Sequence, residues 1–190
     1  MNRLNKIERY CKGGILEIGC GFGEVISYLH KYNLEATEID KERLIYAKKR
    51  FPNINIYDKD IFKQKWNKKY DTILLLGVLE QIDLVPSQAL KHLKMNLREE
   101  GRVIFEVPNT NSLIRRLKCL FGLEPIDSPN SRNYQFTMKR VKEMINQAGY
   151  KIVYLRGTNQ ERIRGLKFWV PSCLSRNYFG VIEKAKKPYF

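Results

Sequence analysis

The sequence predicts an α/β fold built on a mostly parallel sheet. Short apolar, β-branched runs alternate along the chain with segments of helical period, which is the pattern of successive strand–helix units. The chain has 190 residues, of which 43% are hydrophobic and 12% aromatic, so it can bury the core of one ordinary domain. No linker or repeat divides it. We therefore expect a single domain over residues 1–190.

Seven runs are the expected strands. They cover residues 14–18, 34–39, 53–57, 70–76, 102–107, 151–156 and 178–184. The run 70–76 is the most apolar, which predicts a central strand that is buried on both faces.

Helices are expected between these strands. They cover residues 24–32, 42–51 and 86–97, with a fourth that Thr137 caps and that runs to Ala148 before Gly149. Residues 112–121 form a short amphipathic stretch and residues 122–134 a loop. Together they predict a lid-like insertion at about 110–134.

The charge is strongly positive. The chain has 35 Lys and Arg residues against 20 Asp and Glu residues, a net charge of +15. Such an excess predicts attraction to polyanions such as RNA or an anionic lipid surface. Solvated faces without a partner explain the same excess, and charge alone does not choose between them.

Cysteine and histidine are sparse. Cys11, Cys20, Cys119 and Cys173 are scattered without a C-x-x-C pair, and the only histidines are His30 and His92. This usage predicts reduced thiols and no zinc or histidine-rich metal centre. The first residues lack a signal peptide, and no apolar run approaches the roughly 20 residues of a membrane span. We expect a cytoplasmic protein, with peripheral attachment to a membrane as an open alternative.

The strongest motif follows the first strand. It reads Ile15-Leu16-Glu17-Ile18-Gly19-Cys20-Gly21-Phe22-Gly23. Glycines directly after an apolar strand allow a tight turn and a close approach of the backbone to a ligand, while the next helix presents free N–H groups. An ordinary tight turn explains the glycines equally well when they are taken alone.

Two acids at later strand ends sharpen this interpretation. Asp40 follows the second strand, where a carboxylate can accept both hydroxyls of a ribose. Asp60 and Ile61 follow the third strand, where they place an acceptor and an apolar side chain beside an adenine. The alternative role of Asp40 is to cap the helix that begins after it.

Together these motifs resemble the class I S-adenosylmethionine (SAM)-dependent methyltransferases, over about residues 10–190. The segment 71–82 is similar to the family's fourth-strand motif, 97–109 to its fifth-strand motif, and 134–150 to its following helix. The resemblance implies a Rossmann-like, seven-stranded, mostly parallel sheet with helices on both faces and the last strand antiparallel. It also implies SAM as the cofactor and S-adenosylhomocysteine as the product.

The resemblance assigns the cofactor site residue by residue. By this resemblance, the acid and the glycine backbone of the first motif bind the methionine moiety of SAM. Asp40 binds the ribose, and Asp60 and Ile61 contact the adenine. The implied set is Glu17, Gly19, Cys20, Gly21, Gly23, Asp40, Asp60, Ile61 and Gly77.

The nearest subgroup in appearance contains the ubiquinone-pathway O-methyltransferases, and the chain departs from it. Those enzymes carry a Glu-x-x-Glu-His set implicated in metal binding, whereas this chain has Gly77 and Gln81 at two of the three positions. Tyr134 stands where a histidine is usual. We therefore expect no metal and no histidine base, which leaves Glu80 as a weak catalytic candidate.

Three functions stay open. The favoured one is methyl transfer, O-directed, to a small-molecule or lipid- or glycan-linked acceptor. The second is an RNA methyltransferase that uses the basic surface, although the Asn/Asp-Pro-Pro-Tyr motif of base-amino methylases is missing. The third is a non-catalytic SAM-fold subunit. Two interpretations of the segment 113–121 also stay open: it is either a lid over the cleft or a helix that lies on anionic lipid.

Overall fold

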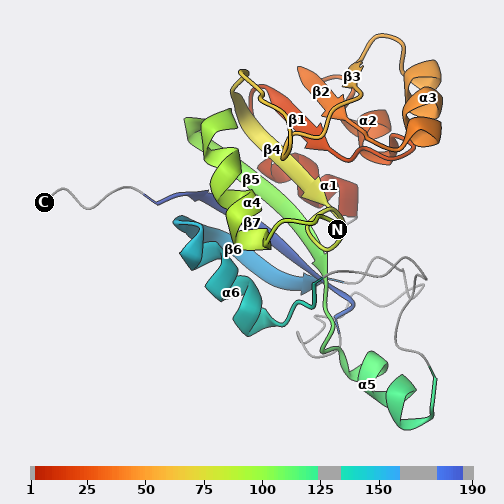
Figure 1. Cartoon of the computed structure of the whole chain (residues 1–190), viewed down its shortest axis with the longest axis vertical. Helices are drawn as coiled ribbons and strands as arrows, with labels where there is room; N and C mark the ends of the chain where they lie inside the picture. Colours follow the sequence, from red (N-terminus) through yellow and green to blue (C-terminus); the bar gives the residue numbers. More distant parts are fainter. Residues whose placement is uncertain (1–2, 124–133, 159–174, 186–190) are drawn as a thin grey trace, which may run out of the picture.

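The computed structural model describes residues 3–123, 134–158 and 175–185. Its centre is one seven-stranded sheet of strand order β3-β2-β1-β4-β5-β7-β6 (Figure 1). The strands are β1 (Ile15–Ile18), β2 (Leu34–Thr37), β3 (Asn55–Tyr57), β4 (Tyr70–Leu76), β5 (Leu97–Pro108), β6 (Tyr150–Thr158) and β7 (Asn177–Lys184).

The sheet has the predicted mixture of directions. The pairs β2–β3, β1–β2, β1–β4 and β4–β5 are parallel, and β7 runs antiparallel to both of its neighbours, β5 and β6. Chain order reverses at β1, which lies between β2 and β4. In such sheets a crevice opens beyond the carboxyl ends of the strands that flank the reversal.

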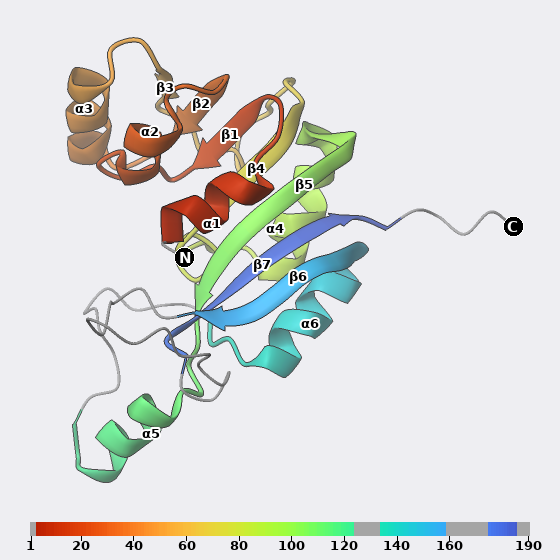
Figure 2. The same ribbon diagram turned by 180° about the vertical axis from the view of Figure 1, so that it is seen from behind.

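Helices cover both faces of the sheet (Figures 1 and 2). They are α1 (Arg3–Tyr10), α2 (Glu24–Leu29), α3 (Lys41–Arg50), α4 (Pro86–Leu93), the 3₁₀ helix η1 (Lys94–Asn96), α5 (Leu113–Leu120) and α6 (Met138–Gln147). Buried side chains of α1, α2 and α3 form one core cluster, and those of α4 and α6 form a second. The predicted fold class is confirmed.

Three elements differ most from the sequence prediction. Helix α1 was not expected, because Ile7 is its one buried residue and its pattern is otherwise polar. Strand β5 begins at Leu97, five residues earlier than expected, because Leu97 is fully buried and pairs with Tyr70 ahead of an irregularity in the ladder. The expected helix 86–97 correspondingly ends at Leu93 and tightens into η1.

Within the described ranges, no helix is long and apolar enough to cross a membrane.

Candidate active site

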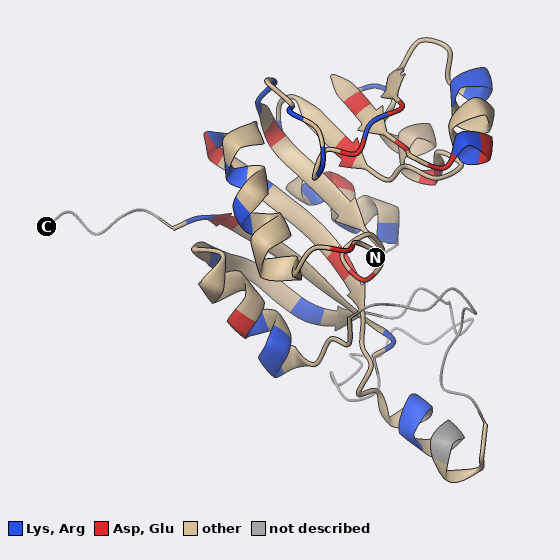
Figure 3. Ribbon diagram, in the orientation of Figure 1, with Lys and Arg blue, Asp and Glu red and all other residues tan. Residues whose placement is uncertain are grey.

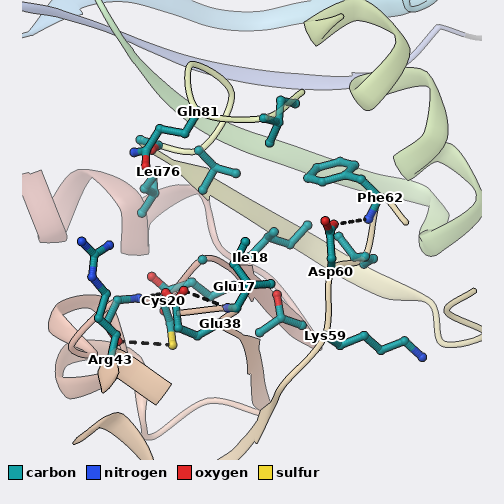
Figure 4. Close-up of a pocket in the computed structure, with 18 of the residues that line it drawn as sticks. Glu17, Ile18, Cys20, Glu38, Arg43, Lys59, Asp60, Phe62, Leu76 and Gln81 are labelled. Carbon is teal, nitrogen blue, oxygen red and sulfur yellow. Dashed lines mark hydrogen bonds between the residues drawn. The ribbon is translucent and has the colours of Figure 1, made fainter. Parts of the chain in front are cut away.

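A cavity of about 440 Å³ opens at the carboxyl edge of β1, β2 and β4 (Figure 4). Its walls come from the turn after β1, the end of β2, the loops after β3 and β4, and the start of α1. These five segments converge where the strand order reverses. Of the nine expected cofactor residues, seven line this cavity: Glu17, Gly19, Cys20, Gly21, Asp60, Ile61 and Gly77.

The glycine turn has the backbone shape that its sequence predicts. Gly21 has a φ of 56°, which only glycine adopts without strain, and no atom lies within 4 Å of the position of a Cβ there. Its backbone therefore faces open space that a ligand can approach. Gly23 is different: it caps α2, and a Cβ on it would lie 2.4 Å from the ring of Phe51. Gly23 serves packing rather than the cavity wall.

Glu17 is a buried carboxyl group at the cavity wall. Its Oε2 is buried without a hydrogen-bond partner. Burial raises the pKa of Glu17 to about 8, the carboxylates of Glu24 and Glu38 add to the rise, and Arg3 opposes it. A carboxylate oxygen left unpaired at a cavity is an acceptor for a ligand that brings its own donors, and a cationic donor fits best.

Glu38 is the acid that the second strand presents to the cavity. Its Oε2 accepts a hydrogen bond of 2.7 Å from the N–H of Gly21, and its Oε1 accepts from the N–H groups of Ile39 and Asp40. A carboxylate has about four acceptor positions, so one on Oε2 is left to face the cavity.

The structure corrects the expectation for Asp40. Its side chain accepts from the N–H of Arg43 and caps α3, is 47% exposed, and lies outside the cavity wall. Of the two acids after β2, Glu38 therefore lines the cavity, and Asp40 has the capping role that was its alternative. Both acids follow the same strand, and the capping role of Asp40 was the signal that distinguished them.

The loop after β3 contributes two of the expected residues to the cavity wall. Asp60 and Ile61 both line the cavity, and Ile61 is fully buried in the core beneath it. Oδ1 of Asp60 accepts a hydrogen bond of 2.9 Å from the N–H of Phe62, which fixes the carboxylate in a tight turn.

The loop after β4 gives the cavity both an amide, Gln81, and an acid, Asp83, which is paired with Lys63 at 3.3 Å. Nε2 of Gln81 donates a 2.6 Å hydrogen bond to the carbonyl oxygen of Gly77, and both residues line the cavity. Glu80, the weak catalytic candidate, is buried beside them and is not among the residues that line the wall. In the described part of the chain, no group of three His, Cys, Asp or Glu side chains is arranged to hold a metal ion.

Arg3 is a lining residue that sequence reasoning missed. Its Nε lies 2.7 Å from Oε2 of Glu106, and one terminal nitrogen lies 3.0 Å from Oε2 of Glu24. These pairs hold α1 across the cavity wall. The partners are 21 and 103 residues away, so no local pattern could reveal them.

Helix α5 does not contribute to the cavity. None of its described side chains lines the wall, and Leu113, Leu117 and Leu120 are exposed. Residues 124–133 of the expected insertion lie outside the described residues, so the lid stays a prediction for that part.

Comparison with known proteins gives a consistent result. A family model described as "Methyltransferase domain" matches residues 7–155. Nodulation protein S of Azorhizobium caulinodans is 33% identical over 135 residues, which span 65% of this chain and 65% of that relative. Ubiquinone biosynthesis O-methyltransferase of Rickettsia canadensis is 26% identical over 199 aligned positions, covering 96% of this chain and 78% of the relative.

Solved structures share the fold. A SAM-dependent methyltransferase from Archaeoglobus fulgidus superposes with a TM-score of 0.71 at 16% identity, covering 96% of this chain and 91% of that one. At this identity the likeness concerns the fold alone.

Proposed function

This chain belongs to the methyltransferase domain family, and from that premise we propose that it methylates a small-molecule or lipid- or glycan-linked acceptor through an oxygen atom, with SAM as the methyl donor. The family match confirms the resemblance to class I SAM-dependent methyltransferases. The acceptor, its reacting atom and the independence from metal are our proposals.

The observation that carries the proposal is the buried carboxyl group of Glu17 beside the glycine turn. Its unpaired Oε2 would accept from the ammonium group of the methionine moiety, while the exposed backbone of Gly21 leaves room for the chain of that moiety. Glu38, rather than Asp40, would take the ribose hydroxyls, and Asp60 with Ile61 the adenine. When bound, SAM supplies a methyl group on a cationic sulfonium, which is itself the leaving group.

The acceptor side of the cavity is mostly apolar. Val78, Ile82, Leu84 and Phe62 line it, together with the neutral amide of Gln81 and the carboxylate of Asp83, which is paired with Lys63. Such a wall would exclude water and orient an acceptor with an apolar part, which is how a site raises the rate when the donor carries the leaving group. The Rickettsia relative, named for ubiquinone biosynthesis, is a precedent for an acceptor of that character.

Metal independence is supported by residue type. Gly77 offers no side chain, and Gln81 already uses its amide N–H on the carbonyl oxygen of Gly77. The acid that this loop does bring to the wall, Asp83, is already paired with Lys63, so the wall would favour an acceptor that ionises readily over one that must be deprotonated by a strong base.

A second candidate is RNA methylation. Four cations, Arg3, Arg43, Lys59 and Lys63, lie at the cavity wall, and the chain carries a net charge of +15. Each of these cations has an intramolecular partner, either an acid or an aromatic ring, which weakens this candidate. The third, a non-catalytic subunit, is opposed by a cavity that keeps Glu17, Gly21 and Glu38 together.

One labelling experiment separates the three candidates. The protein is incubated with SAM labelled in its methyl group and with metabolite extract, lipid extract or RNA, and transferred label is measured in each fraction. We expect label in the small-molecule or lipid fraction, unchanged by EDTA. Label in RNA would overturn the acceptor class. No label in any fraction, with S-adenosylhomocysteine still bound in a thermal-shift assay, would support the non-catalytic subunit.

A further inference from the structure

Helix α5 presents an apolar face that the rest of the described structure leaves uncovered. Leu113, Leu117, Leu120 and Phe121 follow the i, i+4, i+7, i+8 spacing of one helix face. Leu117 is 44% exposed, and Leu120 and Phe121 are each 79% exposed. In both ribbon views the helix extends beyond the end of β5, away from the sheet (Figures 1 and 2). Apolar faces of this kind mark interaction sites.

The base of the helix is fixed to the body even though its tip is exposed. Asn109 directly follows β5, and its Oδ1 accepts a hydrogen bond of 3.0 Å from the N–H of Asn111, while the hydroxyl of buried Ser112 accepts from the N–H of Arg115. The helix therefore leaves the sheet in a defined direction. It does so at the carboxyl edge, the same edge at which the cavity opens.

The charge around α5 is positive. The helix contains three cations and no acid; Arg116 is exposed whereas Arg115 is buried, and Figure 3 shows basic residues at the near end of α6 as well. These are Lys139 and Arg140, exposed in the first turn of α6, which the bridge between Asn109 and Phe136 brings to the base of α5. Nε of Arg116 donates a hydrogen bond of 2.8 Å to Oδ1 of Asn111. Because Asn111 is neutral, this bond does not compensate the positive charge of Arg116.

We propose that α5 docks this protein on an anionic lipid bilayer, with Leu117, Leu120 and Phe121 inserted among the acyl chains and the surrounding cations near the headgroups. Interfacial helices combine an apolar face with a basic polar face in this way. The attachment turns the carboxyl edge of the sheet, and with it the cavity mouth, toward the membrane side of the protein.

Two other occupants fit the face less well. RNA is bound through phosphate contacts and by stacking on aromatic or guanidinium planes; Phe121 could stack, but the three leucines that make up most of the face offer neither contact. A second copy of the chain would place two basic helices side by side on proteins that each carry a charge of +15, which is repulsive. Anionic lipid provides acyl chains for the leucines and negatively charged headgroups for the cations.

Vesicle co-sedimentation tests the proposal, without SAM or acceptor, so that its failure does not bear on methyl transfer. The wild-type protein should sediment with phosphatidylcholine vesicles that contain phosphatidylglycerol, and less with phosphatidylcholine alone or at high salt. The double variant Leu117→Asp with Leu120→Asp should lose about tenfold or more in partitioning, because two leucines no longer enter the apolar phase. Ile45→Asp is the matched control, since Ile45 is 68% exposed on α3.

Charge is tested by a second matched pair. Arg116→Gln should reduce partitioning and its salt dependence, whereas Lys48→Gln, which removes an exposed cation from α3, should change neither. Unchanged thermal unfolding and unchanged S-adenosylhomocysteine affinity establish that each variant is folded.

Insertion is read out by a probe. The parent protein has two tryptophans, and their fluorescence is the baseline. The tryptophan added by Phe121→Trp should be quenched by brominated lipid, whereas the one added by Ile45→Trp should not. Absence of wild-type sedimentation with anionic vesicles at low salt would overturn the proposal, as would equal losses in the α5 and α3 variants. A third outcome would assign the positive charge to nucleic acid instead. In it, the wild type does not bind vesicles, and the Leu117→Asp, Leu120→Asp variant still binds RNA on filters.

Discussion

Oε2 of Glu38 lies 2.7 Å from the backbone nitrogen of Gly21, so the end of β2 is hydrogen-bonded to the glycine turn that follows β1. One carboxylate thereby holds the shape of the turn and lines the cavity beside it. This contact makes Glu38 the acid on which the proposed cofactor site depends, in place of Asp40.

The ion pair between Arg3 and Glu106 should stabilise the protein, because Glu106 is buried and would otherwise lack its cation. Arg3→Ala should lower the free energy of unfolding by roughly 1–3 kcal/mol, measured by urea denaturation. The control is Arg98→Ala, whose ion pair with Asp71 is long, at 3.9 Å, and exposed. Equal losses in the two variants would show that Arg3 acts only as a surface charge.

The burial of Glu17 predicts a pH-dependent stability. Its pKa is raised from 4.5 to about 8, so the folded protein holds a proton that the unfolded chain releases. Stability should therefore fall as pH rises from about 4.5 to 8, by an amount on the order of a few kcal/mol. The side chain of the Glu17→Gln variant cannot ionise. Its free energy of unfolding should therefore fall less over this range than that of the wild type, when both are unfolded in urea without ligand.

A charge control accompanies this measurement. Glu42→Gln removes one exposed carboxylate from α3 and should follow the wild-type pH profile. If Glu17→Gln also follows that profile, Glu17 is ionised in the folded protein and its raised pKa is wrong.

The loop after β4 predicts methyl transfer without a divalent metal. Gly77 and Gln81 stand where metal-dependent relatives carry ligands, so EDTA should leave the rate of S-adenosylhomocysteine release unchanged. Loss of activity in EDTA that magnesium restores would contradict the expectation.

Most of the sheet could be predicted from the sequence. Apolar runs such as Tyr70–Leu76 are buried on both faces, so composition alone marks them, and β4 has the predicted bounds. Strand β5 was predicted too short because Arg98, Glu99 and Glu100 are polar. Their place in the strand follows from the pairing of Leu97 with Tyr70, which is a tertiary contact.

The rest could not be predicted because it depends on distant partners. Helix α1 is held by the ion pairs of Arg3 with Glu24 and Glu106. Both partners lie outside the eight residues of the helix, so the sequence of those residues does not predict the pairs. For α5, amphipathic spacing identified an apolar face but not whether anything covers it. For Asp40 and Glu38, the sequence showed two acids at one strand end, and only the cap on α3 assigned their roles.

The central claim, that SAM binds in the cavity with Glu38 as its ribose acceptor, is tested most directly by isothermal titration with S-adenosylhomocysteine. Glu38→Gln should weaken binding by about ten- to a hundredfold, since a charge-assisted acceptor is lost. Asp40→Ser, which keeps an oxygen to cap α3, should bind as the wild type does. Unchanged affinity in Glu38→Gln, or an equal loss in Asp40→Ser, would contradict the claim.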